Sequence, residues 1–215
     1  GLDVPVILDA RANGAGSLAD TAREMGIRVE NGKAIAKVKG GKRVTGVAVC
    51  AQAGSGSVLE EIACDAVAMS GGWSPVVHLY SHCGGKLNWD DQAVMFRPDL
   101  NRRPTDQNGV GFVTPAGSAN GELTLSAVLV DATARAKEAV KALGHKAPST
   151  RVPEASEQSE NAVEPVWLMP QGAGDKLRMK TWLDFQNDVK VSDVQLAARE
   201  GYESVEHTKR YTTLG

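Results

Sequence analysis

Two histidines and a cysteine lie close together in the sequence, at His78, His82 and Cys83. The spacing His-x3-His places two imidazoles on one face of a helix, and imidazoles together with a thiolate bind zinc. A structural zinc site usually has four ligands, and the remaining histidines, His145 and His207, lie far along the chain. These residues therefore fit a surface helix better than a metal centre. We expect the chain to bind neither zinc nor iron.

A second candidate is the glycine-rich turn PAGSANGELTL, residues 115–125, between an expected strand and an expected long helix. Free backbone N–H groups and the positive end of a helix dipole favour an anionic ligand at such a turn. Gly117 and Gly121 permit a ligand to approach the backbone closely. Ser118 and Thr124 supply hydroxyl groups. Many turns that only join a strand to a helix look the same, so the spacing supports binding and joining equally.

Asp9 ends the first expected strand, where dinucleotide-binding domains place an acid that binds a ribose hydroxyl. The Gly-x-Gly-x-x-Gly motif that should precede it is not in this chain, so the simpler interpretation is that Asp9 caps its own loop. The chain also has no Gly-x-Ser-x-Gly or Cys-x-x-Cys motif, which counts against hydrolase and redox-cysteine chemistry. Cys50 and Cys64 lie in apolar, strand-like surroundings typical of small core residues. We predict no catalytic residue here.

The composition is that of an ordinary soluble globular protein, with 42% hydrophobic and 23% charged residues in a chain of 215. A net charge of −2 gives no electrostatic attraction to nucleic acid or membranes. Three cysteines without paired spacing indicate a reducing, cytoplasmic setting. No apolar run approaches the roughly 18 residues of a membrane span, and no signal peptide is recognisable. The chain enters a strand almost directly after Gly1, so we expect a piece of a longer protein.

The first elements predict a βαβ unit. Residues 4–11 are a continuous apolar run that ends in charged residues, which is typical of a buried parallel strand. Residues 17–26 predict a helix with Ser17 as N-cap and Gly26 as C-terminal stop. A short strand over residues 27–32 completes the unit.

Strands and turns dominate the next stretch. The alternating pattern of residues 34–50 predicts an antiparallel hairpin about a Gly-Gly turn. Residues 64–70 predict a buried strand, and residues 84–99 predict two short strands about a turn. Residues 109–114 predict a further strand. Apolar positions at helical spacing then predict a long helix from Leu125 onward.

The remaining chain changes character. Residues 145–165 are rich in Ser, Glu, Pro and Ala and predict a linker. Residues 166–170 predict an isolated strand. A helix follows, with a capping box of Ser192 and Gln195 and a stop at Gly201. A last helix with Ser204 as N-cap would complete an αα-hairpin.

Together, these elements resemble the second half of a two-dinucleotide-domain flavoprotein of the disulfide-reductase type. In that superfamily an inserted domain ends with a strand and glycine turn that lead back into the first domain. CDAVAMSGGWSP, residues 64–75, resembles this return strand, and residues 109–140 resemble the final strand and helix of the first dinucleotide site. The resemblance implies an α/β fold, part of a two-dinucleotide-binding-domain (FAD/NAD(P)-binding, disulfide-reductase-like) fold, followed by a small helical hairpin domain.

This resemblance predicts four parts. They are the remainder of an inserted NAD(P)-binding-like domain at residues 1–70, the C-terminal half of the FAD/NAD-binding domain at 71–144, a linker at 145–165 and a small helical domain at 166–215.

Two longer motifs resemble the alpha subunit of heterotetrameric sarcosine oxidase. They are DAVAMSGGWSPVVHLYSHCGGKLNWD, residues 65–90, and WLDFQNDVKVSDVQLAAREGYESVEHTKRYTTLG, residues 182–215. The second motif is long and specific, and the resemblance covers nearly the whole chain apart from the linker.

The family's known properties are what this resemblance implies for function. It implies a complex of alpha, beta, gamma and delta subunits that oxidises sarcosine with oxygen, giving glycine and hydrogen peroxide. Tetrahydrofolate takes up the released carbon as 5,10-methylenetetrahydrofolate. The flavins, FAD and FMN, belong to the beta subunit and its interface with alpha, while alpha holds NAD. We therefore expect this chain alone to have no oxidase activity and to bind NAD weakly or not at all.

The resemblance also assigns a cofactor site to the glycine-rich turn. By position, the NAD contacts of the family fall on Ser118, Leu123 and Leu125, with Gly121 and Thr124 in the same turn. The final strand of related FAD domains usually ends in an Asp that binds the ribityl chain. TPAGSANG has no such residue, which agrees with NAD rather than FAD.

The C-terminal helices also resemble the small domain that binds a [2Fe–2S] cluster in related amine and opine oxidases. Such clusters are held by four thiolates, but DFQND stands where a cysteine pair would be, and no cysteine follows Cys83. The fold is therefore expected without its cluster. Two alternatives stay open: the alpha chain of an opine or amino-acid dehydrogenase of the same layout, and a non-catalytic module that docks a partner subunit.

Overall fold

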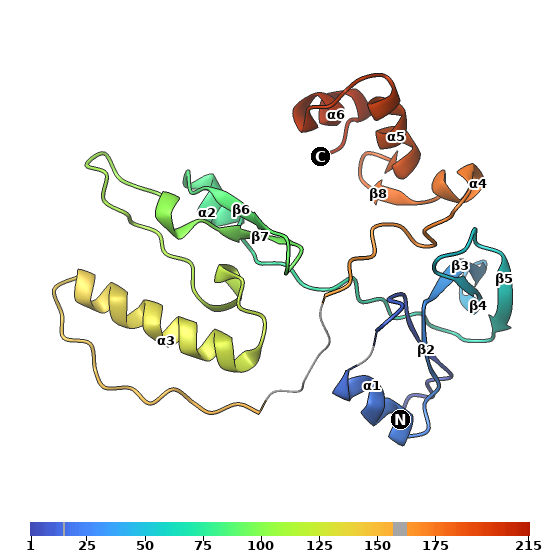
Figure 1. Cartoon of the computed structure of the whole chain (residues 1–215), viewed down its shortest axis with the longest axis horizontal. Helices are drawn as coiled ribbons and strands as arrows, with labels where there is room; N and C mark the ends of the chain where they lie inside the picture. Colours follow the sequence, from blue (N-terminus) through green and yellow to red (C-terminus); the bar gives the residue numbers. More distant parts are fainter. Residues whose placement is uncertain (15, 157–162) are drawn as a thin grey trace. The chain divides into compact units, whose positions relative to one another are not determined.

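The computed structural model describes residues 1–14, 16–156 and 163–215. They form two compact units, of which the first comprises Gly1–Ala68 and Glu164–Gly215 and the second Met69–Val163 (Figure 1). Residues 145–156 contain neither helix nor strand, as expected of a linker, and residues 157–162 of that segment lie outside the described residues. The four-part domain division stays a prediction.

The βαβ unit predicted at the start of the first unit is confirmed, and it consists of β1 (Ile7–Asp9), α1 (Ser17–Glu24) and the parallel β2 (Val29–Asn31). The helix stops as predicted, because Gly26 adopts a left-handed φ of 82°. The predicted cap is wrong by one residue: Gly16 is the N-cap, and its carbonyl accepts the N–H of Asp20. β1 is also less buried than predicted, with Ile7 39% exposed, because its sheet has only two strands.

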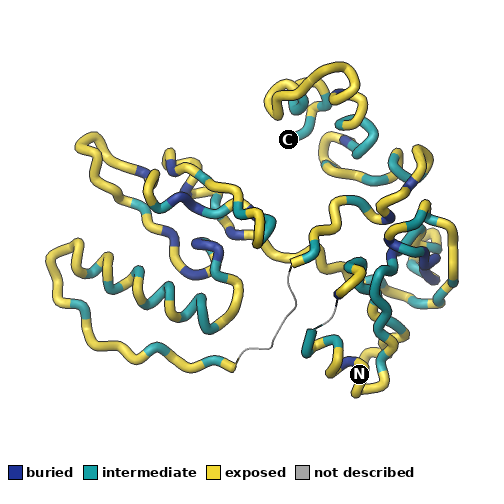
Figure 2. The backbone as a smooth tube through the Cα atoms, in the orientation of Figure 1, coloured by how far each residue is buried: buried dark blue, intermediate teal, exposed yellow. Residues whose placement is uncertain are grey.

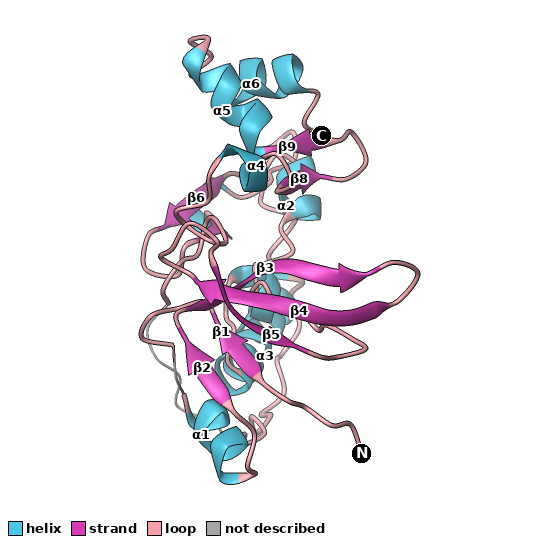
Figure 3. Ribbon diagram, turned by 90° about the vertical axis from the view of Figure 1, so that its right-hand side faces the viewer, coloured by secondary structure: helices cyan, strands magenta, loops and turns pink. Residues whose placement is uncertain are grey.

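The predicted hairpin is confirmed and extends to a three-stranded antiparallel sheet of β3 (Lys33–Gly40), β4 (Val44–Ala51) and β5 (Val58–Ile62) (Figure 3). β4 lies in the centre, and residues 46–50 along it are buried. Val49 is 2% exposed and Cys50 is fully buried, so the prediction of Cys50 as a small core residue is confirmed. Burial raises the pKa of the Cys50 thiol, which keeps it protonated and unreactive.

The strand predicted over residues 64–70 is wrong, because no strand is described between β5 and α2. Cys64 is only partly buried, and Met69 is 89% exposed. Gly72 adopts a φ of 90°, and Pro75 lacks an N–H group. Both lie just beyond the predicted strand and mark where it would end, and within the described residues no neighbouring strand pairs with residues 64–70.

The C-terminal part of the first unit contains α4 (Asp175–Arg178), β8 (Trp182–Asp184), β9 (Val189–Lys190), α5 (Val191–Arg199) and α6 (Val205–Thr212). The isolated strand predicted at residues 166–170 is wrong. This segment is instead held by single hydrogen bonds, since the Gln52 side chain donates to the Leu168 carbonyl at 2.7 Å and the Gln171 N–H donates to the Gln52 carbonyl at 2.7 Å. Pro170 supplies no donor for a ladder.

Both C-terminal helices occur where the sequence predicts them, but α5 is capped differently. The predicted box of Ser192 and Gln195 is wrong, because the Asp193 carboxylate accepts the Lys190 N–H at 2.8 Å. Gly201 follows the C-cap of α5 and stops the helix as predicted, with a left-handed φ of 89°. Ser204 is the N-cap residue of α6, as predicted.

The second unit contains α2 (His78–His82), β6 (Leu87–Asp90), β7 (Met95–Pro98), two single-turn 3-10 helices, η1 (Leu100–Arg102) and η2 (Gly117–Asn120), and α3 (Leu125–Ala142). The predicted two-stranded hairpin is confirmed by the antiparallel pairing of β6 and β7. The strand predicted at residues 109–114 is wrong: a single bridge between Thr105 and Gly111 is described there. Pro104 and Pro115, which lack N–H donors, flank this segment.

The long helix is confirmed as α3, although no residue along it is fully buried. Figure 2 shows exposed and half-buried residues alternating along its length. Among the described residues, no helix is both long and apolar enough to cross a bilayer.

The Asp99 carboxylate, beside η1, gives rise to a pH prediction. The Arg102 guanidinium, with Nε 2.5 Å from Oδ2, lowers the pKa of this carboxyl below its ordinary value of 3.8. The unfolded chain therefore takes up the proton first, so the stabilisation is complete above about pH 4 and is lost as the pH falls through the folded-state pKa. We expect the free energy of unfolding to fall with pH below about 4, and to fall less steeply in Asp99→Asn.

Urea unfolding from about pH 6 to about pH 3 measures this slope. Asp3→Asn, which removes an exposed carboxylate near the N-terminus, controls for the loss of one charge. A slope as steep in Asp99→Asn as in the unchanged protein would contradict the prediction.

Candidate functional site

The glycine-rich turn leads from η2 into α3 and depends on two left-handed glycines. Gly117 has a φ of 58° and Gly121 a φ of 92°, which residues with a side chain rarely adopt. The Gly121 N–H donates to the Ser118 carbonyl at 3.1 Å, and the Glu122 N–H donates to the Gly117 carbonyl at 3.2 Å. The backbone therefore closes the turn on itself.

The five residues predicted to bind a cofactor lie together on this turn, but they play different parts in it. Ser118, Leu123, Thr124 and Leu125 are exposed, whereas Gly121 is buried. The two leucines are 49% and 59% exposed, so they offer apolar surface in the same turn as the exposed Ser118. The Thr124 hydroxyl accepts the Ala127 N–H at 3.4 Å and so caps α3.

Asp131 lies on α3 and contacts the turn, although the sequence did not identify it as part of the site. Its Oδ2 accepts the Gly117 N–H at 2.8 Å, and its Oδ1 accepts the Asn120 side-chain amide at 3.2 Å. The Arg135 Nε lies 3.2 Å from Oδ1, and this ion pair raises the pKa of Arg135. A signal was present in the sequence: Asp131 and Arg135 lie one turn apart, on the same helix face as the apolar Val128.

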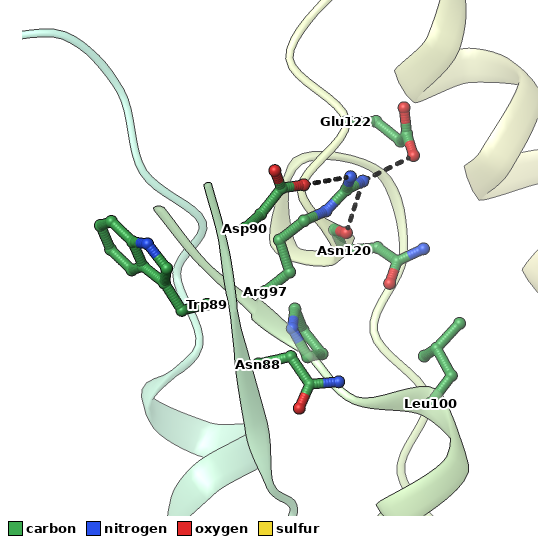
Figure 4. Close-up of a pocket in the computed structure, with 8 residues that line it drawn as sticks. Asn88, Trp89, Asp90, Arg97, Leu100, Asn120 and Glu122 are labelled. Carbon is green, nitrogen blue, oxygen red and sulfur yellow. Dashed lines mark hydrogen bonds and ion pairs between the residues drawn. The ribbon is translucent and has the colours of Figure 1, made fainter. Parts of the chain in front are cut away.

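Arg97, on β7, contacts the turn from its other side and was also missed (Figure 4). Its guanidinium lies 3.3 Å from the Asp90 carboxylate and 3.0 Å from the Glu122 carboxylate, and it donates to the Asn120 carbonyl at 3.4 Å. A Cβ atom at Gly121 would lie 2.3 Å from the Arg97 Nε. The glycine is therefore required by a close approach as well as by its backbone conformation.

An open pocket of about 420 Å³ borders this arginine, and it is lined by Asn88, Trp89, Asp90, Arg97, Pro98, Leu100, Asn120 and Glu122. In Figure 4 the Trp89 ring points away from the Arg97 guanidinium. The charged groups that line this pocket are paired with each other, and the pair of Arg97 with Glu122 connects β7 to the turn.

His78 and His82 lie exposed on α2, and Cys83 caps its C-terminal end. The surface-helix interpretation is thus confirmed for these residues. Within the described ranges, no group of three or more His, Cys, Asp or Glu residues is arranged to hold a metal ion.

Asp9 is engaged by its own loop. Its carboxylate accepts the Arg11 backbone N–H at 2.9 Å and pairs with the Arg11 guanidinium at 2.7 Å. The guanidinium lowers the pKa of this carboxyl. These contacts are those expected of a loop cap.

The DFQND motif forms the turn between β8 and β9. The Asp184 carboxylate accepts the Gln186 and Asn187 N–H groups at 2.8 and 3.1 Å. The Asn187 side-chain amide and the Gly215 N–H also donate to this carboxylate, and the bonds from the Asn187 side chain, Gly215 and these two N–H groups lower the pKa of Asp184. The residues at the place of a cysteine pair therefore organise a hairpin through hydrogen bonds.

Residues 178–215 match the family model of the sarcosine oxidase A3 domain. The chain is 36% identical over 216 aligned residues to the sarcosine oxidase subunit alpha of Rhizobium meliloti (strain 1021), which covers 100% of this chain and 20% of the relative. It is 32% identical to the corresponding subunits of Corynebacterium sp. strains P-1 and U-96, with 98% of this chain covered and 21% and 22% of theirs. The chain thus spans about a fifth of the length of these curated relatives.

Among solved structures, the chain is similar in fold to L-proline dehydrogenase from P. horikoshii, with a TM-score of 0.57 at 19% identity. That match covers 97% of this chain and 40% of the dehydrogenase chain. The fold is accordingly a mixed α/β fold found also in a dehydrogenase. The resemblance seen in the sequence is confirmed: this chain is related along its whole length to sarcosine oxidase alpha subunits, and residues 178–215 match the model of the A3 domain.

Proposed function

We propose that this chain is the part of a sarcosine oxidase alpha subunit that holds NAD through the turn at residues 115–125. The observation that carries the proposal is the identity of 36% to a named alpha subunit over the whole chain. The alternative, a subunit of an opine or amino-acid dehydrogenase, is supported by a similarity of fold at 19% identity. In this proposal the subunit belongs to an oxidoreductase that acts on a CH–NH group.

The complex proposed around this chain is cytoplasmic and contains beta, gamma and delta subunits. It oxidises sarcosine to glycine with oxygen, releases hydrogen peroxide and forms 5,10-methylenetetrahydrofolate from tetrahydrofolate. FAD and FMN supply the redox chemistry from other chains. This chain supplies NAD binding and contacts for assembly, and none of its residues takes part in the oxidation.

The exposed face of the turn fits the dinucleotide in three respects. Ser118 presents an exposed hydroxyl group, and the N-terminus of α3 follows in the same turn. Leu123 and Leu125 present apolar surface that a nicotinamide or adenine ring can cover. Because Asp131 already accepts the Gly117 N–H at 2.8 Å, the pyrophosphate would lie on the Ser118 side of the turn.

Replacing Ser118 by glutamate in the complete alpha subunit tests this assignment. The new side chain would fill the space beside the ligand and repel its pyrophosphate. Losing one charge-assisted contact costs about 1.5–3 kcal/mol, which corresponds to a roughly ten- to hundredfold weaker affinity. The measurement is the NAD retained by the purified, folded subunit.

Ser81→Glu is the matched control, since it adds the same charge at an exposed position on α2. NAD content should be unchanged in that variant. If Ser118→Glu also retains NAD at the unchanged level, the turn only joins two elements and the assignment is rejected.

A further inference from the structure

Asn120 lies between two charged side chains that come from different elements. It is 8% exposed. Its side-chain amide donates to Asp131 Oδ1 at 3.2 Å, and its backbone carbonyl accepts from the Arg97 guanidinium at 3.4 Å. A single buried residue of the turn is thus held from α3 on one side and from β7 on the other.

Asp131 acts on the turn at two points. It accepts the N–H of Gly117, the first residue of η2, and the side-chain amide N–H of Asn120, the last residue of η2. The Asp131 side chain is only 13% exposed, and hydrogen bonds to a charged, largely buried acceptor are stronger than those between neutral groups. The carboxylate therefore fixes both ends of η2 against α3.

Holding η2 against α3 also fixes where the residues predicted to bind the ligand lie. Ser118 lies between the two residues that Asp131 holds, and Thr124 and Leu125 follow at the start of α3. If η2 moves relative to α3, the position of Ser118 relative to the N-terminus of α3 changes. Displacements of this kind weaken sites that depend on converging groups.

We propose that Asp131, acting through Asn120 and Gly117, is a positioning residue for NAD binding at this turn. The inference rests on the proposed function. Asp131 itself does not touch the ligand, because its carboxylate is turned to the inner side of the turn and is occupied by donors of this chain.

An exchange of the two side chains separates positioning from a general loss of stability. Asn120→Asp sets two carboxylates against each other at a spacing of about 3.2 Å. In Asp131→Asn the remaining oxygen can accept the Gly117 N–H, and the Asn120 amide and the Arg135 Nε then lose their acceptor. The double variant restores the contact between positions 120 and 131 in reverse, since the amide at position 131 can accept the Gly117 N–H and donate to the new carboxylate at position 120. Arg135 loses its contact with position 131 in this variant and keeps its ion pair with Glu138. A double-mutant cycle then measures the coupling.

The experiment compares the NAD dissociation constant of the complete alpha subunit in four forms, all well below their melting temperatures. We expect each single variant to bind NAD about tenfold or more weakly, and the double variant to recover to within about threefold of the unchanged protein. Glu138→Gln is the control: it removes the other partner of Arg135, at 2.7 Å, and leaves the turn untouched. Its NAD affinity should not change.

The outcomes are distinguishable. If the unchanged subunit holds NAD and both single variants hold it equally well, the positioning role is overturned while the proposed function stands. A double variant no better than the singles also overturns it. If Asn120→Asp does not fold, Asp131→Asn alone decides, because normal NAD affinity in that variant is incompatible with the proposal. If the unchanged subunit binds no NAD, the proposed function fails, and the positioning role fails with it.

Discussion

Replacing Val49 by aspartate is expected to abolish cooperative folding of the three-stranded sheet. Val49 lies at the centre of β4, is 2% exposed and is among the largest fully buried side chains described. An unpaired carboxylate at this place loses its hydration without gaining a partner, which costs several kcal/mol. Domains are stable by only about 5–15 kcal/mol. Urea unfolding followed by circular dichroism measures the result.

Val38→Asp is the matched control for this variant. Val38 lies on the neighbouring strand β3 and is 48% exposed, so a carboxylate there stays hydrated. We expect a change within about 1 kcal/mol. A cooperative transition of Val49→Asp within the same range would show that the sheet does not form the core.

Replacing Gly121 by alanine is expected to destabilise the second unit by about 2–4 kcal/mol. The left-handed backbone at Gly121 costs about 1–2 kcal/mol for an alanine. The added Cβ would also stand 2.3 Å from the Arg97 Nε. The arginine must then move away from Asp90 and Glu122, which costs about 1–2 kcal/mol more.

Gly109→Ala separates these two causes. Gly109 has a similar φ of 78°, but a Cβ atom there would meet nothing within 4 Å. We expect it to show the backbone cost alone, about 1–2 kcal/mol. Equal losses of unfolding free energy in the two variants would mean that the contact with Arg97 adds nothing.

Local signals in the sequence account for the elements that were predicted correctly. A short-range pattern of apolar residues and glycines predicts each of three elements: α1, which Gly26 stops, the hairpin of β3 and β4, and the long helix α3. Such patterns reflect interactions within one element or between neighbours in the chain.

The wrongly predicted strands share one physical cause. Residues 64–70, 109–114 and 166–170 are apolar enough for strands, but a strand exists only when a partner accepts its hydrogen bonds. The Leu168 carbonyl, for example, accepts a hydrogen bond from the Gln52 side chain instead of from a neighbouring strand. Whether a partner is available depends on the whole fold and cannot be read from the segment itself.

The residues of the candidate site also fall into those that the sequence could identify and those that it could not. Gly117 and Gly121 could be recognised because glycine is the residue that a left-handed turn requires. The groups that hold the turn could not, because Arg97 reaches Glu122 from another element. Asp131 gave only the weak signal of a charged pair on an apolar helix face.

The first unit is interrupted in sequence, since Gly1–Ala68 and Glu164–Gly215 form one compact unit around the segment Met69–Val163. This arrangement has a consequence for the order of folding. During synthesis the inserted unit is complete before the second part of the first unit emerges, so it can fold while its host still lacks contacts such as that of Gln52 with Leu168. The entropy lost on closing the host across an insertion grows only slowly with length, by about 0.6 kcal/mol for each doubling. An insertion that folds early replaces part of this flexible path by a folded unit, so destabilising the inserted unit should slow the closing of the host only modestly.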